Sequence, residues 1–200
     1  MSSLDVERAA VAALAAFDHM TTSRLRALLT GRNASEAFAI AAGDTAAPPR
    51  LCSEFARYSG LADAWRRSAA VRSVEQMGEW CASLGVGVVL EGDPEFPAVL
   101  RHDPRRPAVL FVQGELAGAL EQRRVGVVGT RNPTRRGIDT ATQFGRSFAA
   151  AGVSVVSGLA LGIDAAAHRG ALSIDDAAPL AVVANGHDDP YPRRNRALWH

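Results

Sequence analysis

Two strand-like segments that each run into a glycine turn constrain the fold of this 200-residue chain more than any other feature. The first reads Val-Gly-Val-Val-Gly-Thr-Arg over residues 125–131, and the second reads Val-Val-Ser-Gly-Leu-Ala-Leu-Gly-Ile-Asp over residues 155–164. A short apolar run that ends in glycine before a helix is typical of β-α-β units. Because the carboxyl ends of parallel strands meet at one edge of a sheet, we expect both turns to line one crevice.

The first turn has the chemistry of an anion site. Gly129 lacks a Cβ, so its backbone can approach a phosphate closely, and Thr130 adds a hydroxyl donor. Arg131 supplies a guanidinium that can hold a phosphate through two parallel hydrogen bonds. Alternatively, Gly129 and Gly158 only permit tight turns and Arg131 is a solvated charge. The presence of two such turns favours the phosphate interpretation.

Two familiar nucleotide-binding motifs are absent. Residues 126–131 lack the Gly-x-Gly-x-x-Gly spacing of dinucleotide sites, and serine follows Val156 where an acidic residue would be needed to hold a ribose. A Walker-type loop requires a lysine, whereas all 22 basic residues of this chain are arginine. Genomic base composition and selection for phosphate recognition would each explain that bias.

The periodicity of apolar residues changes near residue 85. Helical spacing before that point predicts helices at 6–17, 24–29, 35–41, 53–68 and 74–84, with a loop at 43–49. The pattern after it predicts strands at 86–90, 108–112, 124–128, 153–156 and 180–184, and helices at 137–150 and 162–172. Successive β-α-β units imply right-handed crossovers. We therefore expect an α/β fold, a Rossmann-like mostly parallel sheet preceded by a small helical domain.

Composition narrows the setting in which the protein works. Residues 1–122 contain twelve arginines and fifteen acidic residues, whereas residues 123–200 contain ten arginines and six acidic residues, which suits an anionic partner for the C-terminal part. Cys52 and Cys81 lie in no metal-ligand spacing, and the N-terminus has no secretory or membrane-spanning pattern. We expect a cytoplasmic protein without a metal, a cofactor or a membrane partner.

Four motifs, in order, resemble the DNA-processing protein A (DprA/Smf) family. They are Gly-Thr-Arg-Asn-Pro-Thr at 129–134, Ser-Gly-Leu-Ala-Leu-Gly-Ile-Asp at 157–164, Ala-His-Arg-Gly-Ala-Leu at 167–172 and Tyr-Pro-Arg-Arg-Asn at 191–195. The stretch Asp-Pro-Glu-Phe-Pro at 93–97 is similar to a further family signature. The resemblance implies a Rossmann-like core over residues 73–200, incomplete at its C-terminal side. A helical domain similar to sterile alpha motif or helix-hairpin-helix modules would occupy residues 1–72.

The resemblance also implies a function without enzymatic turnover. Family members bind single-stranded DNA and help to load the RecA recombinase during natural transformation. Their self-association surface lies largely beyond residue 200 of this chain, so a homodimer is expected only of a full-length form. Carried over by motif, the DNA-binding residues would be Gly129, Thr130, Arg131, Arg135, Arg136, Ser157, Gly158, Gly162, Asp164, His168 and Asn195.

Two departures limit that transfer. Leu161 stands where many members have a lysine or arginine that aids DNA binding, which predicts a weaker affinity here. Family chains also continue through further strands, whereas this chain stops at His200. Truncation at that point would leave an unpaired sheet edge and exposed apolar surface.

Acidic and histidine side chains near the motifs have two interpretations each. Asp164 in the first turn of its helix can cap that helix or belong to a site. His168, one turn later, would form an acid-base pair with it, but no serine or cysteine elbow completes a triad. Asp188 and Asp189 lack a third ligand for a metal.

Further arginines surround the motifs. Arg135 and Arg136 follow the first turn, and Arg193, Arg194 and Arg196 follow Tyr191, a pattern that fits either a single strand stacked on an aromatic side chain or a solvated basic face. One alternative function is a Rossmann-like nucleotide phosphoribohydrolase of the lysine-decarboxylase-like type, whose Pro-Gly-Gly-x-Gly-Thr stretch is missing here. Another is a truncated, inactive relic.

Overall fold

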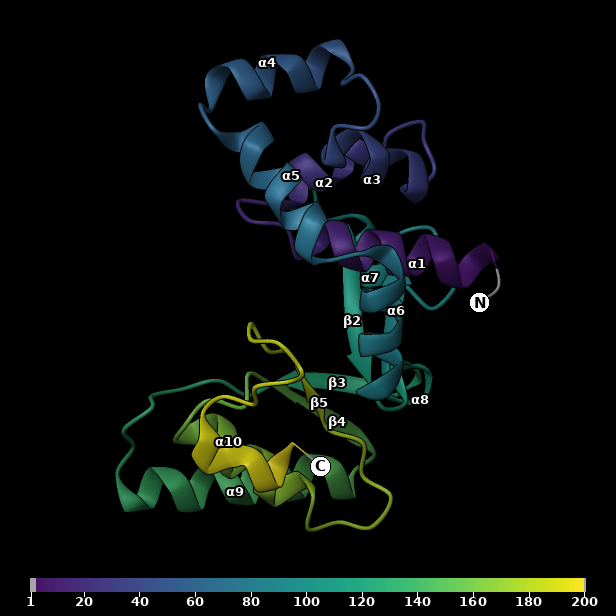
Figure 1. The fold of residues 1–200 in the computed structure, drawn as a ribbon. Coiled ribbons are helices and arrows are strands. Elements are labelled where there is room, and N and C mark those ends of the chain that lie inside the picture. Colours follow the sequence, from purple (N-terminus) through teal and green to yellow (C-terminus); the bar gives the residue numbers. More distant parts are fainter. Residues whose placement is uncertain (1–2, 200) are drawn as a thin grey trace. The chain divides into compact units, whose positions relative to one another are not determined.

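The structure is a computed structural model that describes residues 3–199 (Figure 1). The chain divides into two compact units, Met1–Gly114 and Glu115–His200. The expected division into a helical domain over residues 1–72 and a Rossmann-like core over residues 73–200 stays a prediction. By packing, the division falls after Gly114, because the first two strands lie against the N-terminal helices.

The first unit is built mainly from helices. They are α1 (Ser3–Ala15), α2 (Thr22–Leu29), α3 (Ala34–Ala42), α4 (Pro49–Arg57), α5 (Leu61–Val71), α6 (Val74–Ser83) and α7 (Ala98–Arg101). Polar side chains at Thr21, Asn33 and Ser73 cap three of these helices by accepting backbone N–H bonds. The fully buried Trp65 and Leu14 lie at the centre of the helical core.

One helix predicted from the sequence was wrong. The pattern indicated a single helix over 53–68, but the chain forms α4 and α5 with a break between them. Helix α4 ends at Arg57, and Gly60, with a left-handed φ of 82° that a side chain would disfavour, immediately precedes α5. Apolar periodicity continued across this break, so it did not reveal the change of direction.

Strands β1 (Val86–Leu90) and β2 (Val109–Gln113) form an antiparallel pair of their own, with Val88 opposite Phe111. They form a sheet separate from the parallel one, a pairing that the alternating pattern after residue 85 did not indicate. The 93–97 stretch folds between the two strands. Its Phe96 is buried, and its Asp93 pairs with Arg8 of α1 at 3.0 Å.

The second unit contains the parallel sheet and the candidate site. Its elements are α8 (Leu116–Glu121), β3 (Arg123–Gly126), α9 (Arg135–Ala150), β4 (Val153–Ser157), α10 (Ile163–Ala171), β5 (Leu180–Ala181) and a 3-10 helix, η1 (Arg193–Leu198). The strands pair in parallel in the order β3-β4-β5. This arrangement confirms the α/β, Rossmann-like fold class, although β5 is much shorter than the predicted strand over 180–184.

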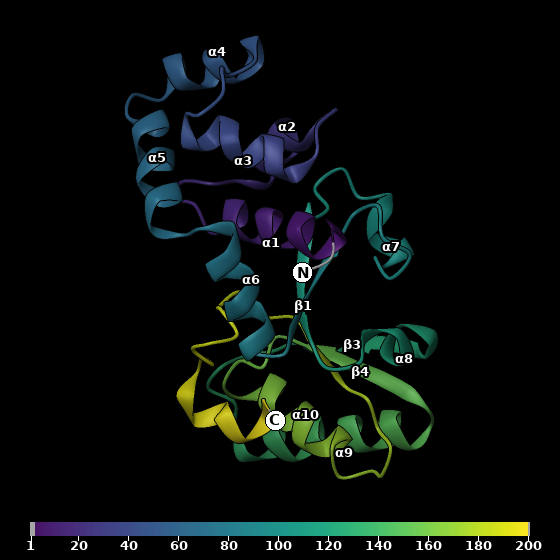
Figure 2. The ribbon, with the colours of Figure 1, turned by 45° about the vertical axis from the view of Figure 1, so that its right-hand side comes forward.

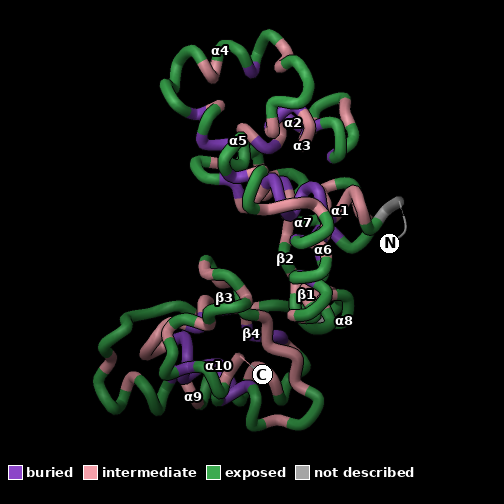
Figure 3. The backbone as a smooth tube through the Cα atoms, in the orientation of Figure 1, coloured by how far each residue is buried: buried purple, intermediate pink, exposed green. Residues whose placement is uncertain are grey.

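Helices α9 and α10 pack closely side by side, as both ribbon views show (Figures 1 and 2). Gly145 of α9 lies against the backbone of Ala167, and Gly170 of α10 lies against the backbone of Thr142, with no room for a Cβ at either glycine. Most of α10 is buried (Figure 3). Small residues in both helices therefore hold α10 close against α9, while Ala167 and Ala171 of α10 pack on Val155 of β4.

Strand β3 is an edge strand among residues 3–199, since it pairs only with β4. Beside it runs an apolar groove of about 750 Å³ between β3 and α9. Val128 is 77% exposed and Phe144 is 53% exposed along this face. The described part of the chain thus leaves apolar surface uncovered next to the strand.

Candidate anion-binding site

Two loops leave the carboxyl ends of β3 and β4 and lie next to each other. We call residues 127–134 the first loop and residues 158–162 the second loop. The Ser157 hydroxyl donates to the Val127 carbonyl oxygen at 2.6 Å, and the Val127 amide donates to the Val156 carbonyl oxygen at 2.9 Å. The two turns therefore share one crevice of the parallel sheet, as the sequence pattern predicted.

Asp164 joins the two loops. Its Oδ1 accepts the amide of Gly129 at 3.3 Å, and its Oδ2 accepts the amide of Gly158 at 3.1 Å. Asp164 is buried, whereas Gly129 is exposed and Gly158 is half-buried, so the carboxylate reaches both loops from inside the unit. The two glycine amides that were expected to face an anion donate to this internal carboxylate instead.

Close backbone approach explains the glycines of the two loops. A Cβ at Gly129 would lie 2.7 Å from the Ile163 side chain, and one at Gly158 would lie 3.1 Å from Oδ2 of Asp164. Gly162 has a φ of 88° and lies directly against the Thr130 carbonyl oxygen. The amide of Ile163 donates to that same oxygen at 3.2 Å, so the first turn of α10 is hydrogen-bonded to the first loop.

Asn195 holds the second loop from the other side. Its Nδ2 donates to the carbonyl oxygens of Leu159 at 2.8 Å and Ala160 at 3.2 Å, and the residue is buried. Leu161, the position where many family members have a cation, is half-buried in this loop. The motif residues Ser157, Asp164 and Asn195 thus lie within the protein and maintain the shape of the loops.

The cations of the motif are on the surface. Arg131 lies in the first loop, while Arg135 and Arg136 begin α9, and all three side chains are exposed. Within residues 3–199 none of them forms an ion pair. The first turn of α9 contains no acidic residue, although the start of a helix carries partial positive charge. Three unpaired cations at a positive helix end favour an anionic ligand.

Side-chain hydroxyls shape the turn that carries Arg131. Thr130 accepts the amide of Asn132 at 3.1 Å, which leaves its hydroxyl proton available for a ligand. Thr134 caps α9 by accepting the amide of Gly137 at 3.1 Å. Sequence reasoning missed the role of Thr134, although a threonine immediately before a helical run is a recognised cap signal.

His168 is buried one turn after Asp164, and its Nε2 has no hydrogen-bond partner among the described residues. Burial lowers the pKa of His168, while a hydrogen bond with the Ser157 backbone and the charge of Asp164 oppose that shift. The imidazole is therefore enclosed within the second unit, and its predicted role in DNA binding stays a prediction.

The second basic cluster lies on and around η1. Tyr191 is 65% exposed, and Arg193, Arg194 and Arg196 are exposed as well. Arg193 lies 4.0 Å from Asp189, so part of its charge is offset locally. Residues 3–199 contain no group of three or more His, Cys, Asp or Glu side chains placed to hold a metal. In that range, no helix is both long enough and apolar enough to cross a bilayer.

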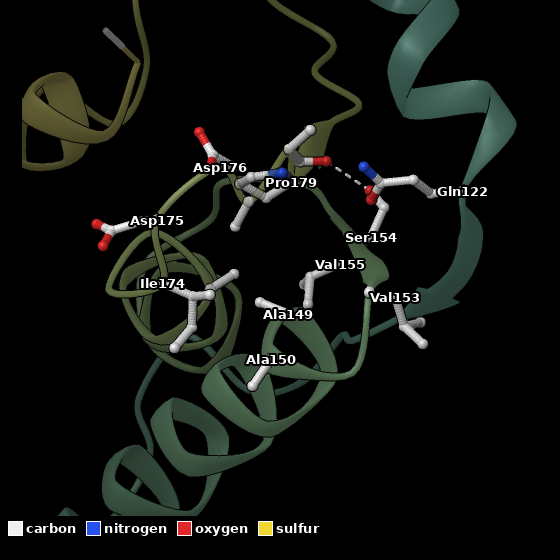
Figure 4. Close-up of a pocket in the computed structure, with 14 residues that line it drawn as sticks. Gln122, Ala149, Ala150, Val153, Ser154, Val155, Ile174, Asp175, Asp176 and Pro179 are labelled. Atoms are coloured by element: carbon white, nitrogen blue, oxygen red, sulfur yellow. Dashed lines mark hydrogen bonds between the residues drawn. The ribbon is translucent and has the colours of Figure 1, made fainter.

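A separate cavity of about 300 Å³ lies at the opposite end of β4 (Figure 4). Apolar side chains of Val155, Ala149 and Ile174 surround it, and the carboxylates of Asp175 and Asp176 point away from it toward solvent. None of the predicted site residues lines this cavity. It is therefore distinct from the crevice formed by the two loops.

Comparisons with known proteins agree with the motifs. The family model for DNA recombination-mediator protein A matches residues 87–200. Protein Smf of Synechocystis sp. is 38% identical over 110 residues, which cover 54% of this chain and 27% of the relative. DNA processing protein DprA of Bacillus subtilis is 34% identical over 116 residues, which cover 57% of this chain and 38% of the relative.

A solved structure of DNA processing protein A from Streptococcus pneumoniae aligns with the whole chain. The TM-score is 0.67, the sequence identity is 20%, and the alignment covers 100% of this chain and 64% of that one. At this identity the likeness establishes the fold. The chain spans well under half the length of these two curated relatives.

Proposed function

The chain belongs to the DNA recombination-mediator protein A family, and we propose that it binds single-stranded DNA through the first loop and the start of α9. Three exposed and unpaired guanidinium groups around one helix N-terminus carry this proposal, namely those of Arg131, Arg135 and Arg136. Each can hold a phosphate with parallel hydrogen bonds, and the free amides at the helix start add further donors. Successive phosphates of one strand would follow this basic surface.

Single strands suit the site better than a duplex. The cations sit on a loop and a helix end, and no helix within residues 3–199 presents a row of side chains patterned to read a major groove. Contacts made mainly to phosphates tolerate any base sequence and weaken as salt displaces them. Since Leu161 offers no charge in the second loop, the arginines of the first loop and α9 supply most of the attraction.

A titration of fluorescently labelled oligonucleotides tests the proposal. At fixed moderate salt the protein should bind poly-dT and mixed-sequence single strands with similar affinity, and a duplex of the same length more weakly. The logarithm of the binding constant should fall linearly with the logarithm of the salt concentration. Equal affinity for duplex and single strand would contradict the assignment.

The biological role follows as a further proposal. Relatives carry the name DNA processing protein, and we place this chain in DNA processing in the cytoplasm during natural transformation, where it would help to load the RecA recombinase on single strands. A full-length form would self-associate as a homodimer. The protein should be added to RecA and a single strand that is already coated with a single-strand-binding protein. It should shorten the lag before RecA filaments form, and an unchanged lag would contradict this role.

We also propose that the protein works without catalytic turnover. Asp164 and His168 are buried, and both carboxylate oxygens of Asp164 accept backbone amides of the loops. Prolonged incubation with single-stranded DNA or with nucleoside monophosphates should leave these substrates intact by chromatography. Release of a free base from a nucleotide would instead support the phosphoribohydrolase alternative.

A further inference from the structure

We propose that Asp164 is a positioning residue that holds the first and second loops together and so fixes Arg131 for its phosphate contact. The inference rests on the proposed function for its consequence in DNA binding. Its structural part, a single carboxylate that joins two loops, stands on the geometry alone.

The carboxylate is fully engaged by the protein. Oδ1 accepts from Gly129 at 3.3 Å and Oδ2 accepts from Gly158 at 3.1 Å, in a residue that is only 4% exposed. An exposed aspartate would be free to meet water or a metal, whereas this one has each oxygen aimed at one loop. Buried carboxylates are retained in proteins when backbone donors compensate for the loss of water.

Arg131 lies two residues after the glycine that Asp164 holds. Between them, the Thr130 carbonyl oxygen accepts the Ile163 amide at 3.2 Å, so two consecutive residues of the first loop are attached to the first turn of α10. Gly162 lets that turn approach the loop without a side chain in between. Contacts from α10 thereby help to set the backbone direction at Arg131, together with the bond between Thr130 and Asn132 inside the loop.

Electrostatics and positioning predict opposite effects of removing the charge. A buried carboxylate close to the loop repels an incoming phosphate, so its neutralisation alone should strengthen DNA binding. If the carboxylate positions the loop, its neutralisation should weaken binding despite the gain in net positive charge. The sign of the change therefore separates the two roles.

Asp164→Asn is the near-isosteric variant for this test. An asparagine offers one acceptor and one NH₂ donor, so it can satisfy only one of the two glycine amides and faces the other with a donor. Ser154→Ala is the matched control, because the buried Ser154 hydroxyl donates to the Ala178 carbonyl oxygen near the start of β4, at the end of the strand away from the loops. Both variants remove a buried polar interaction of the same unit.

Amide hydrogen exchange measures the clamp without DNA. In the parent protein the amides of Gly129 and Gly158 should both be protected, and in Asp164→Asn at least one should lose protection by tenfold or more, whereas Ser154→Ala should leave both unchanged. Protection of both glycine amides in the parent is a measurement that needs no variant to fold. Fast exchange of either glycine amide in the parent, or retained protection of both amides in Asp164→Asn, would overturn the clamp.

Single-strand affinity then measures the consequence for Arg131. Asp164→Asn should weaken binding on the order of tenfold, which is no more than the loss in Arg131→Ala, and the double variant should be no weaker than Arg131→Ala alone. Unchanged or tighter binding by Asp164→Asn, or additive losses in the double variant, would overturn the positioning role. If the parent binds no oligonucleotide, the proposed function is wrong, and the exchange experiment alone decides the clamp.

Discussion

The side-chain amide of Asn195 donates to the carbonyl oxygen of Leu159 at 2.8 Å, and Leu159 is a buried residue with a φ of 52°. A positive φ at leucine costs of order 1–3 kcal/mol and persists only where the surroundings hold it. Residue 195 belongs to η1, far along the chain from the second loop. The Tyr-Pro-Arg-Arg-Asn motif at 191–195 therefore stabilises the backbone of the motif at 157–164.

Replacing Asn195 with alanine should lower the free energy of unfolding, because Asn195 is buried and supports the second loop. The Leu159 and Ala160 carbonyl oxygens would lose a shared buried donor, at a cost of about 1–3 kcal/mol in the free energy of unfolding. Asn185→Ala is the matched control, since Asn185 also donates to two carbonyl oxygens but in an exposed setting. Urea denaturation of the two variants should give clearly different midpoints, and equal midpoints would show that the second loop does not depend on Asn195.

Gly170→Ala should lower the free energy of unfolding by about 1–3 kcal/mol or more. The new Cβ would overlap the backbone of Thr142 on the neighbouring helix. Gly118 offers a control within a helix, as a Cβ there would meet nothing within 4 Å. Gly118→Ala should be neutral or slightly stabilising through helix propensity. Thermal melts followed by circular dichroism would measure both, and a stable Gly170→Ala protein would mean that α9 and α10 are not held as closely as described.

Much of the fold could be predicted because its signals are local. The second unit alternates apolar strands with amphipathic helices, so the parallel sheet and the crevice at residues 129 and 158 followed from spacing alone. The antiparallel pairing of β1 with β2 could not be predicted, since strand register depends on tertiary packing. The break at Gly60 was missed because apolar periodicity ran through it.

The roles of the site residues were harder to predict than their positions. The motifs brought Gly129, Gly158 and Asp164 together, but sequence alone left open whether the aspartate caps its helix or faces a ligand. The answer depends on a contact between residues 129 and 164, which no local pattern encodes. Solvent exposure also could not be read from the motifs: the arginines are exposed, whereas Ser157, Asp164 and Asn195 are buried.

His168 should make the stability of the protein depend on pH. Burial lowers its pKa in the folded state below the usual 6.5, so above that pH the imidazole is neutral in both states and contributes no penalty. As pH falls below 6.5, the unfolded chain takes up the proton first, and the free energy of unfolding decreases until the folded-state pKa is reached. His168→Gln should flatten this slope in denaturation curves recorded between pH 7 and pH 5, whereas the exposed His102→Gln should retain it. A parent-like slope in His168→Gln would assign the dependence to another group.

Arg131→Ala should be the most damaging single change for DNA binding, because it removes the proposed bidentate phosphate contact of the first loop. A charge-assisted hydrogen bond contributes on the order of 1.5–3 kcal/mol, which corresponds to a loss of roughly ten- to hundredfold in affinity. Arg135→Ala should cost less, since Arg136 beside it can partly replace its charge.

Arg146→Ala is the matched control. Arg146 is an exposed arginine near the other end of α9, and its replacement changes the net charge by the same amount as Arg131→Ala. The salt dependence of binding should become shallower by about one counterion in Arg131→Ala and stay unchanged in Arg146→Ala. If the two variants bind a single strand equally well while their circular dichroism matches the parent, the attraction comes from overall charge and the first loop is not a phosphate site.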